Sequence, residues 1–502
     1  MRNYSFSPLP GPEMLPAIMP VDISVTTAAT ASTPQPRNFR VLAVIVASSL
    51  FMEQLDATVL TTALPTMARS FSVAPLHMSL ALTSYLLSLA IFIPASGWVA
   101  DRYGARNIFC ISIGIFTLGS ILCGLAGSLE VLVAARLLQG LGGAMMVPVG
   151  RLILLRNVAK TDLIAAMSWL LVPALLGPIL GPPVGGFIVT YLDWRWIFYI
   201  NVPIGLIGVA LAVWLIPDIK EPPKGGFDIL GLLLSGIALA CLTFGVELGG
   251  RGVFSGAQTL IVIGIAGISF ALYLLHARRL ASPILDMSLM RIPTFSLSVI
   301  AGALTRITGG AMPFLLPMMM QLGFGMSAAE SGMVTFMSAI GFMLMKAGAT
   351  PILRRYGFRS TMVWNALFAT ALIAVCAAFR PAWPLWLMYA VLLAGGFLQS
   401  LQFAAYNTIA YADIPRDRMS SATSFYATFQ QLMLSLGICL SSGVLHLSVT
   451  LSGHEHAQLS DFSLAILVVT AISFFASPVS LLFPKTAGDD MRGITPRVAS
   501  DD

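Results

Sequence analysis

The chain alternates between long apolar stretches and short polar turns. Fourteen of these stretches run for about 20 residues or more, which lets a helix cross a hydrocarbon core roughly 30 Å thick. We predict membrane-spanning helices near 41–64, 78–99, 107–127, 131–150, 164–190, 196–216, 228–247, 257–276, 294–320, 329–350, 360–379, 384–410, 421–448 and 462–483.

One polar turn occurs twice. Asp101–Arg106 joins two apolar stretches, and Arg354–Arg359 does the same 253 residues later, with Arg-Tyr-Gly-x-Arg in common. The copy has Arg354 where the first turn has Asp101. A repeated basic turn between spans of membrane length indicates two related halves, as in many transporters.

Composition supports a membrane protein. Hydrophobic residues make up 57% of the 502 residues and charged residues only 10%, far from the balance of a soluble domain. The formal net charge is +6. The positions of the Lys and Arg residues along the chain indicate where this positive charge comes from.

Most basic residues fall on one side of the predicted membrane. With the N-terminus inside, the outward segments hold Arg69, Arg195, Arg251 and Arg380, and the spans hold Arg136, Arg306 and Lys346. The remaining Lys and Arg residues, out of 28 in total, fall on inward segments. This asymmetry follows the positive-inside rule. It predicts cytoplasmic ends and explains the net charge without a nucleic-acid partner.

Both ends are polar. Residues 1–38 are rich in Pro, Ser, Thr and Ala and lack the charged start and apolar core of a signal peptide. We interpret them as a disordered cytoplasmic extension, or as an upstream start that is not used. Residues 485–502 are predicted to be a cytoplasmic tail.

Several kinds of chemistry are disfavoured. The five cysteines lie within apolar stretches, where packing is their usual role, and we predict no metal site and no cofactor. No Gly-Lys-Ser/Thr of a phosphate-binding loop is present, and no filter-like Gly-Tyr-Gly run suggests a channel. We therefore predict a carrier driven by a gradient and not an enzyme.

Three charges inside spans need an explanation because they are costly in a bilayer. Glu53 and Asp56 are three residues apart and face one side of a helix. Asp56 lies about 12 Å, and Arg136 about 9 Å, from the outward end at 1.5 Å per residue. An ion pair between Asp56 and Arg136 is therefore geometrically feasible. Alternatively, Asp56 caps a kink and Arg136 binds free carbonyls.

The fifth predicted span contains Gly177–Gly186, with Pro178, Pro182 and Pro183 among its glycines. Prolines remove backbone donors, and glycines let a second helix approach closely. The segment is either a structural kink or a hinge that seals a cavity during exchange. The hinge hypothesis involves Gly177, Pro178, Gly181, Pro182, Gly185 and Gly186.

Together these motifs resemble the major facilitator superfamily, and within it the fourteen-span drug:proton antiporters of the EmrB/QacA type. The resemblance covers residues 40–483. It is carried by Leu55–Pro65 in the first span, the turn Gly97–Arg106, Arg136–Gly140, Gly177–Gly186 and Trp194–Gly205. Gly143–Arg151 and Leu275–Arg279 look like the HsrA/MdtD-like subgroup. Thr61, Ala105 and Glu53 depart from the usual motifs.

The resemblance implies an all-α membrane fold with two six-helix bundles and two extra central helices. We expect the bundles at 39–216 and 294–484, with the inserted helices and linkers at 217–293. The inserted spans hold few polar residues apart from Glu247, and we interpret them as structural. The turn residues Gly97, Asp101, Arg102, Gly104 and Arg106 would form a cytoplasmic gate.

The second bundle contributes candidate substrate contacts. Arg306 lies near the middle of the ninth span, where a cation needs a partner or a wet cavity. Gln399, Gln402 and Asn407 could line a cavity or join helices through hydrogen bonds. Each of the four residues therefore has a functional and a structural interpretation.

We predict a plasma-membrane (bacterial inner-membrane) secondary transporter that exports small hydrophobic or cationic compounds in exchange for protons. Asp56, with Glu53, would carry the proton, and Arg136 would tune or relay it. The alternatives are an exporter of an anionic metabolite such as a carboxylate, and a transport-incompetent membrane sensor. Expected partners are the substrate, protons and the lipid bilayer; a periplasmic adaptor is compatible with the sequence but not indicated by it.

The charge asymmetry gives a testable topology. Reporters fused at His456, in the last outward turn, and at Lys485, after the last span, should report opposite compartments. An alkaline phosphatase and a fluorescent-protein fusion at each position measure this, and the same compartment for both positions would contradict the fourteen-span model.

Overall fold

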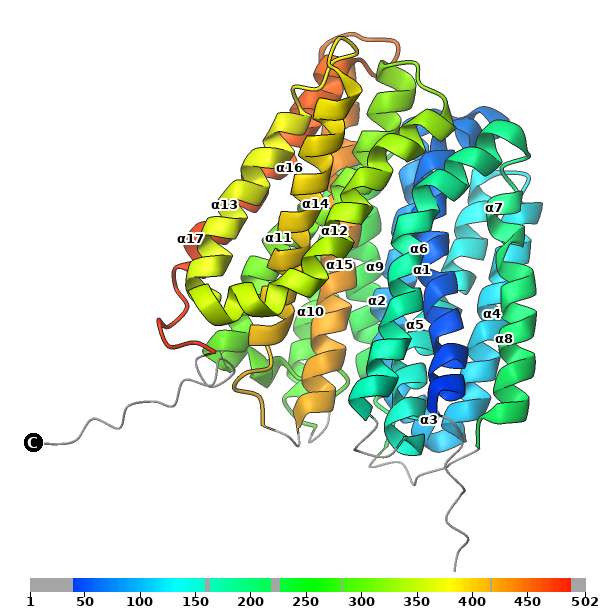
Figure 1. Cartoon of the computed structure of the whole chain (residues 1–502), viewed down its shortest axis with the longest axis vertical. Helices are drawn as coiled ribbons and strands as arrows, with labels where there is room; N and C mark the ends of the chain where they lie inside the picture. Colours follow the sequence, from blue (N-terminus) through cyan, green and yellow to red (C-terminus); the bar gives the residue numbers. More distant parts are fainter. Residues whose placement is uncertain (1–38, 159–162, 218–225, 281–282, 416–417, 489–502) are drawn as a thin grey trace, which may run out of the picture. The chain divides into compact units, whose positions relative to one another are not determined.

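A computed structural model describes residues 39–158, 163–217, 226–280, 283–415 and 418–488. The predictions for the extension 1–38 and for the tail beyond residue 488 lie outside the described residues. The compact unit contains helices and no strand in its described part (Figure 1).

The helices follow the predicted apolar stretches in order. They are α1 (Phe39–Ser70), η1 (Pro75–Met78), α2 (Ser79–Phe92), η2 (Ile93–Ala95), α3 (Ser96–Tyr103), α4 (Ala105–Leu125), α5 (Leu129–Asn157), α6 (Leu163–Tyr191), α7 (Trp196–Tyr199), α8 (Asn201–Leu215), α9 (Ile229–Gly250), α10 (Gly256–Ala277), η3 (Met287–Arg291), α11 (Pro293–Met318), η4 (Met319–Gly323), α12 (Ala328–Tyr356), α13 (Phe358–Cys376), α14 (Leu385–Ile409), α15 (Met419–Leu451), α16 (Leu459–Phe474) and α17 (Ala476–Ser480).

Thirteen helical spans in the described part are long and apolar enough to cross a membrane. The remaining predicted span, 164–190, coincides with α6, whose side chains are described from Leu176 onward, and this apolar part is shorter. The all-helical membrane architecture is thus confirmed. The division into two bundles and an inserted pair stays a prediction.

Helix ends follow from local sequence. Ser255 and Gln258 form a capping box at the start of α10, and Ser327 and Glu330 form another at the start of α12. The Ser128 hydroxyl accepts a hydrogen bond from the Val131 amide at the start of α5. These side chains satisfy amide groups that have no partner within the helix.

The repeated turn has the same geometry in both copies. Gly104 and Gly357 have φ values of 93° and 78°, a backbone conformation that glycine adopts readily because it has no Cβ. Each glycine ends one helix by donating its amide to the fourth residue before it, Ala100 or Leu353. Each also accepts at its carbonyl from the fourth residue after it. The sequence repeat is therefore also a structural repeat.

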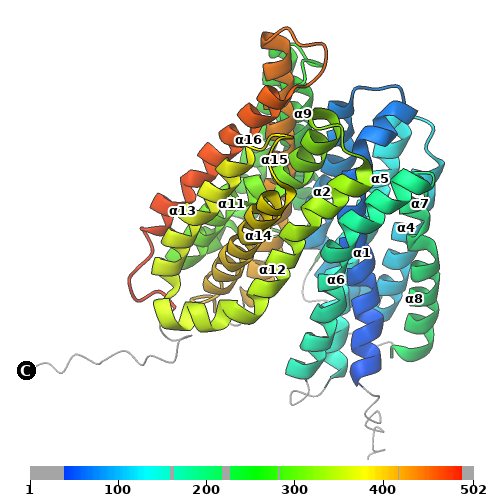
Figure 2. The ribbon, with the colours of Figure 1, turned by 45° about the horizontal axis from the view of Figure 1, so that its top comes forward.

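We call the end of the unit that holds turns 71–74, 126–128 and 452–458 the upper end, after its place in Figure 1. The turns that join α3 to α4 and α12 to α13 lie at the opposite, lower end. Helices α6 and α12 pack together, as do α2 and α15. Two hydrogen bonds near the upper end also join the first half of the chain to the second. Gln321 Nε2 of η4 donates to the Thr62 carbonyl of α1 (2.9 Å), and the Ala329 amide of α12 donates to Thr190 Oγ1 of α6 (3.1 Å). Figure 2 shows the ribbons of α6 and α12 diverging toward the lower end.

Glycines set the closest helix contacts. A Cβ on Gly396 of α14 would collide with the Ser338 carbonyl of α12, and a Cβ on Gly341 of α12 would collide with the Leu393 carbonyl of α14. By contrast, a Cβ on Gly395 would meet nothing within 4 Å. Small residues that allow backbone contact are a common way to join helices in a membrane.

These neighbouring glycines provide a matched test of backbone contact. Gly396→Ala should destabilise the protein by about 1–3 kcal/mol, the usual cost of overpacking. Gly395→Ala should be neutral or stabilising, since alanine favours a helix over glycine by about 1 kcal/mol. Unfolding of the detergent-solubilised variants measures both, and equal stabilities would contradict the contact.

Candidate functional site

The predicted ion pair between α1 and α5 is present. Arg136 Nη1 lies 2.5 Å from Asp56 Oδ2. The Arg136 side chain is fully buried, and that of Asp56 is 1% exposed. Helix rise predicted that Asp56 and Arg136 lie at similar depths in the membrane. In the structure the two side chains are in direct contact.

Neutral donors complete the surroundings of the carboxylate. Gln139 Nε2 and Asn201 Nδ2 both donate to Asp56 Oδ1, at 2.9 and 3.0 Å. The same two amides also donate to Ser120 Oγ. Asp56 thus accepts three N–H hydrogen bonds from α5 and α8, an arrangement that suits its ionised form.

Arg136 has further partners. Its Nε donates to the Ala81 carbonyl of α2 at 3.1 Å, and its Nη1 to Gln139 Oε1 at 2.6 Å. Its guanidinium stands 4.3 Å from the centre of the Tyr85 ring, close enough for a cation–π interaction. Arg136 therefore makes both of the contacts considered from the sequence: it pairs with the Asp56 carboxylate, and it binds a helix carbonyl.

Sequence reasoning missed Gln139 and Asn201 as contacts of the carboxylate, and Ser120 as the hydroxyl that holds both of their amides. Gln139 follows Arg136 by three residues and faces the same side of α5, so its spacing was an available signal. Ser120 and Asn201 carried no such signal. The packing of α8 against α1 brings Asn201 to Asp56, and the packing of α4 against α5 and α8 brings Ser120 to Gln139 and Asn201.

Glu53 lies beside this network without joining it. Its side chain is buried, with the residue 7% exposed, and within the described structure its Oε2 has no hydrogen-bond partner. Asp56 and Arg151 both interact with it electrostatically. An incompletely bonded acid one turn from an ion pair is suited to holding a proton.

The glycine-rich segment of α6 packs directly against α1. A Cβ on Gly177 would lie 2.6 Å from Gln54 Cβ, and one on Gly185 would lie 2.6 Å from the Val59 carbonyl oxygen. Gly181, between them, has no room for a Cβ beside Thr58. The three glycines lie in one row along α6, and this row, which we call the α6 glycine ridge, lies against the helix that carries Asp56.

The other side of the same segment contacts α12. A Cβ on Gly186 would lie 2.5 Å from the Ala328 carbonyl oxygen, and one on Gly332 of α12 would collide with the Pro182 carbonyl. The prolines do not interrupt α6, which is continuous from Leu163 to Tyr191. α6 is therefore held between α1 and α12 by close backbone contact, which is compatible with a hinge but does not test that role.

The predicted gate residues lie on α3 and at the start of α4. Gly97, Asp101 and Arg102 belong to α3, Gly104 is the turn, and Arg106 is the second residue of α4. Arg102 is exposed, whereas Asp101 and Arg106 are half-buried. The structure places all five residues at the lower end; their gating role stays a prediction.

The four candidate substrate contacts separate into two groups. Arg306 Nη2 donates to Asn407 Oδ1 at 2.9 Å and also to Tyr426 and Gln430, each at 3.2 Å. Gln399 lies beside Gly309, one turn along α11 from Arg306.

Gln402 points elsewhere. It accepts from Asn365 Nδ2 at 2.5 Å and donates to the Met362 carbonyl at 3.1 Å, so it joins α14 to α13. The structure thus brings Arg306, Asn407 and Gln399 into one region and separates Gln402 from them, in agreement with the helix-joining interpretation of that residue.

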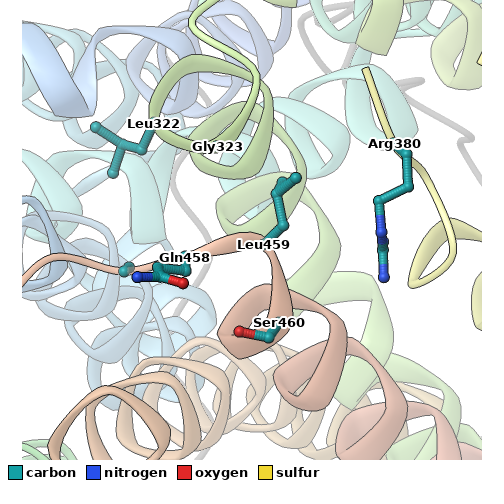
Figure 3. Close-up of a pocket in the computed structure, with 7 residues that line it drawn as sticks. Leu322, Gly323, Arg380, Gln458, Leu459 and Ser460 are labelled. Atoms are coloured by element: carbon teal, nitrogen blue, oxygen red, sulfur yellow. The ribbon is translucent and has the colours of Figure 1, made fainter. Parts of the chain in front are cut away.

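One surface pocket lies apart from all of these residues. It has a volume of about 500 Å³ and opens at the upper end (Figure 3). Its lining consists of Leu322, Gly323, Arg380, Ala457, Gln458, Leu459 and Ser460. None of the predicted site residues lines it, and we assign it no role.

Comparisons with known proteins agree with the resemblance seen in the motifs. The family model described as Major Facilitator Superfamily matches residues 46–438. The chain is 37% identical over 453 residues to a "Putative multidrug resistance protein MdtD" of Salmonella dublin, covering 88% of this chain and 96% of that protein. The protein with the same description from Salmonella typhimurium is 37% identical over 454 residues, with the same coverage.

Solved structures of transporters have the same fold. A D-xylose-proton symporter superposes with a TM-score of 0.65 at 14% identity, covering 89% of this chain and 98% of that one. A point mutant of the nucleoside transporter NupG superposes with a TM-score of 0.62 at 17% identity, covering 88% of this chain and 99% of that one.

The buried pair can be tested through stability. Arg136→Met should destabilise the protein by about 3–5 kcal/mol, because it leaves the Asp56 carboxylate buried without its counter-ion. Arg136→Met combined with Asp56→Leu removes both charges and should recover most of that loss. Unfolding of the two single variants and the double variant in detergent gives the coupling energy, and additive effects would show that the contact is energetically unimportant.

Proposed function

Because the chain belongs to the major facilitator superfamily, we propose that it is a proton-coupled antiporter that exports small hydrophobic or cationic compounds by alternating access. The observation that carries the proposal is the buried Asp56–Arg136 pair, with the acid Glu53 one turn away. The resistance-protein names of the relatives favour multidrug export over the two alternatives, a carboxylate exporter and a sensor.

The proposal includes an orientation and a division of the chain. The protein is a multi-pass membrane protein; we propose the bacterial inner membrane, with both ends in the cytoplasm, from the Lys and Arg distribution. The upper end is then outward. We further propose bundles at 39–216 and 294–484 around the inserted helices.

In this orientation the described conformation is closed on the outward side. The hydrogen bonds Gln321–Thr62 and Ala329–Thr190 join the proposed bundles near that end. Asp56 accepts three N–H hydrogen bonds here, which suits a carboxylate that has released its proton toward the cytoplasm.

Proton uptake would need Arg136 to leave Asp56. A buried carboxylate that loses its cationic partner favours the protonated form, so separation of α1 from α5 after outward opening would promote proton binding. Return of Arg136 would expel the proton. One proton crossing about 150 mV supplies roughly 3.5 kcal/mol, enough for about a 300-fold substrate gradient.

The remaining predicted residues fit supporting roles in this cycle. We propose that the α6 glycine ridge is the hinge and that the turn Gly97–Arg106 is the cytoplasmic gate. Arg306, Gln399 and Asn407 are proposed to border the substrate path. The helix bonds of Gln402 favour a structural role for that residue.

The proton site can be tested in proteoliposomes with an imposed pH gradient and a panel of hydrophobic cations. Asp56→Asn should abolish export against a gradient while leaving downhill substrate exchange, since asparagine cannot carry a proton. Glu53→Gln with Asp56→Asn should be more severe than either single change, because it removes both acids.

The exposed acid Glu455 provides a control, and Glu455→Gln should transport as wild type. Downhill exchange confirms that each variant is folded. If the double variant still concentrates substrate when only a pH gradient is imposed, the proton site lies elsewhere.

A further inference from the structure

A further buried acid, apart from Glu53 and Asp56, lies on the helix pair that sequence analysis interpreted as structural. Glu247, in the last turn of α9, is 0% exposed. Yet α9 and α10 are the least buried of the thirteen spans in the described part. A charged residue inside a membrane span is costly and indicates a function by default.

The hydrogen bonding of Glu247 is incomplete. Its Oε1 accepts a hydrogen bond from the Ser79 hydroxyl of α2, whereas its Oε2 has no partner in the described structure. Arg251 Nη1 is 3.5 Å from Oε1, at the limit of a hydrogen bond. A buried, ionised carboxylate needs stronger hydrogen bonding than one hydroxyl, the Cys439 thiol and a guanidinium at 3.5 Å provide. A proton on Glu247 would remove the deficit of the carboxylate, although the buried guanidinium of Arg251 would then lose its counter-ion in the closed state.

The acid lies where helices of both proposed bundles meet. Ser79 Oγ is 3.2 Å from Ser442 Oγ of α15, and Ser442 donates to the Leu76 carbonyl at 3.4 Å. A Cβ on Gly250, the last residue of α9, would lie 3.0 Å from Gly443 Cα of α15. Figure 1 shows α9 beside α2 and α15. Separation of α2 from α15 would therefore break the surroundings of Glu247 and admit water.

Other titratable groups surround this position. Arg251 interacts electrostatically with His77 of η1 and with His446 of α15. A Cβ on Gly252 would lie 3.4 Å from His446 Nε2. The Cys439 thiol of α15 also faces Glu247. On α10, packed on the other side, Tyr273 and His276 lie near the opposite end of the helix.

We propose that Glu247 is a second proton-binding site, which exchanges its proton with the upper side and stabilises the closed upper end when protonated. The neutral side chain remains in the dry contact between α2, α9 and α15. The ionised side chain favours separation, because water and a closer Arg251 then solvate it. The proton enters and leaves on one side, so it regulates opening without driving transport.

This inference rests on the proposed function for the outward orientation of the upper end and for the opening motion. The size of the expected pH effect follows from the number of protons linked to closure. One proton linked to closure changes the ratio of closed to open molecules by up to about tenfold per pH unit. The closed population should rise as the pH falls through the titration of Glu247.

The distance across the upper end can be measured by electron paramagnetic resonance. Spin labels at Ala74, just before η1, and at Ser452, just after α15, report this distance; both residues are exposed. The half-buried Cys110 and Cys241 are replaced by alanine. Full-length protein in lipid nanodiscs is measured from pH 5 to pH 9, in a Glu53→Gln, Asp56→Asn background that removes the proposed proton carriers.

The expected result is a short-distance population that decreases as the pH rises. Glu247→Gln should keep the short distance at every pH, because it resembles the protonated acid; Glu247→Leu serves if the glutamine variant folds poorly. As a control, Glu130→Gln changes an exposed acid at the same end and should titrate like its parent.

Two results would overturn the inference: no pH dependence in the parent, or the same titration in the Glu247 variants. Failure of the proposed function is a separate outcome, since it shows in the gradient-driven transport of protein with intact Glu53 and Asp56. The distance measurement requires no substrate and no gradient.

Discussion

The requirement that a charge inside a bilayer must have a partner governs the centre of this protein. Asp56 and Arg136 satisfy it for each other, and this contact fixes the rotation of α1 relative to α5. Once those helices are oriented, Gln139 and Asn201 must face inward to complete the hydrogen bonding of the Asp56 carboxylate. The Ala81 carbonyl must likewise face Arg136. The positions of α2 and α8 thus depend on one ion pair.

Close backbone contact provides the second constraint. The Asp56 helix lies against Gly177, Gly181 and Gly185 of α6, and the far side of α6 lies against α12. The glycines leave few side chains between α1, α6 and α12, so the three helices are in close backbone contact in this conformation. This sequence of contacts connects the buried pair to the hydrogen bonds at the upper end.

The spans and the ion pair could be predicted from sequence because both depend on position along a helix. The length of an apolar stretch identifies a membrane-spanning helix. The rise per residue of a helix then gives the depth of Asp56 and Arg136 in the membrane. The contacts of Ser120 and Asn201 depend instead on how separate helices are rotated and packed, which a single sequence does not encode locally. The same limit explains Gln402, whose side chain joins α14 to α13 while Gln399 and Asn407 of the same helix lie near Arg306 and Gly309 of α11.

The seam between α1, α6 and α12 also bears on how such a protein can change over generations. Positions such as Gly181 and Gly332 have no space for a side chain, so almost every substitution there is lost to natural selection before it can alter what is carried. Adaptation to a new compound is therefore expected at residues outside the seam, leaving the close helix contacts unchanged while the specificity diverges. A carrier built in this way separates the residues that can evolve from those that must stay constant.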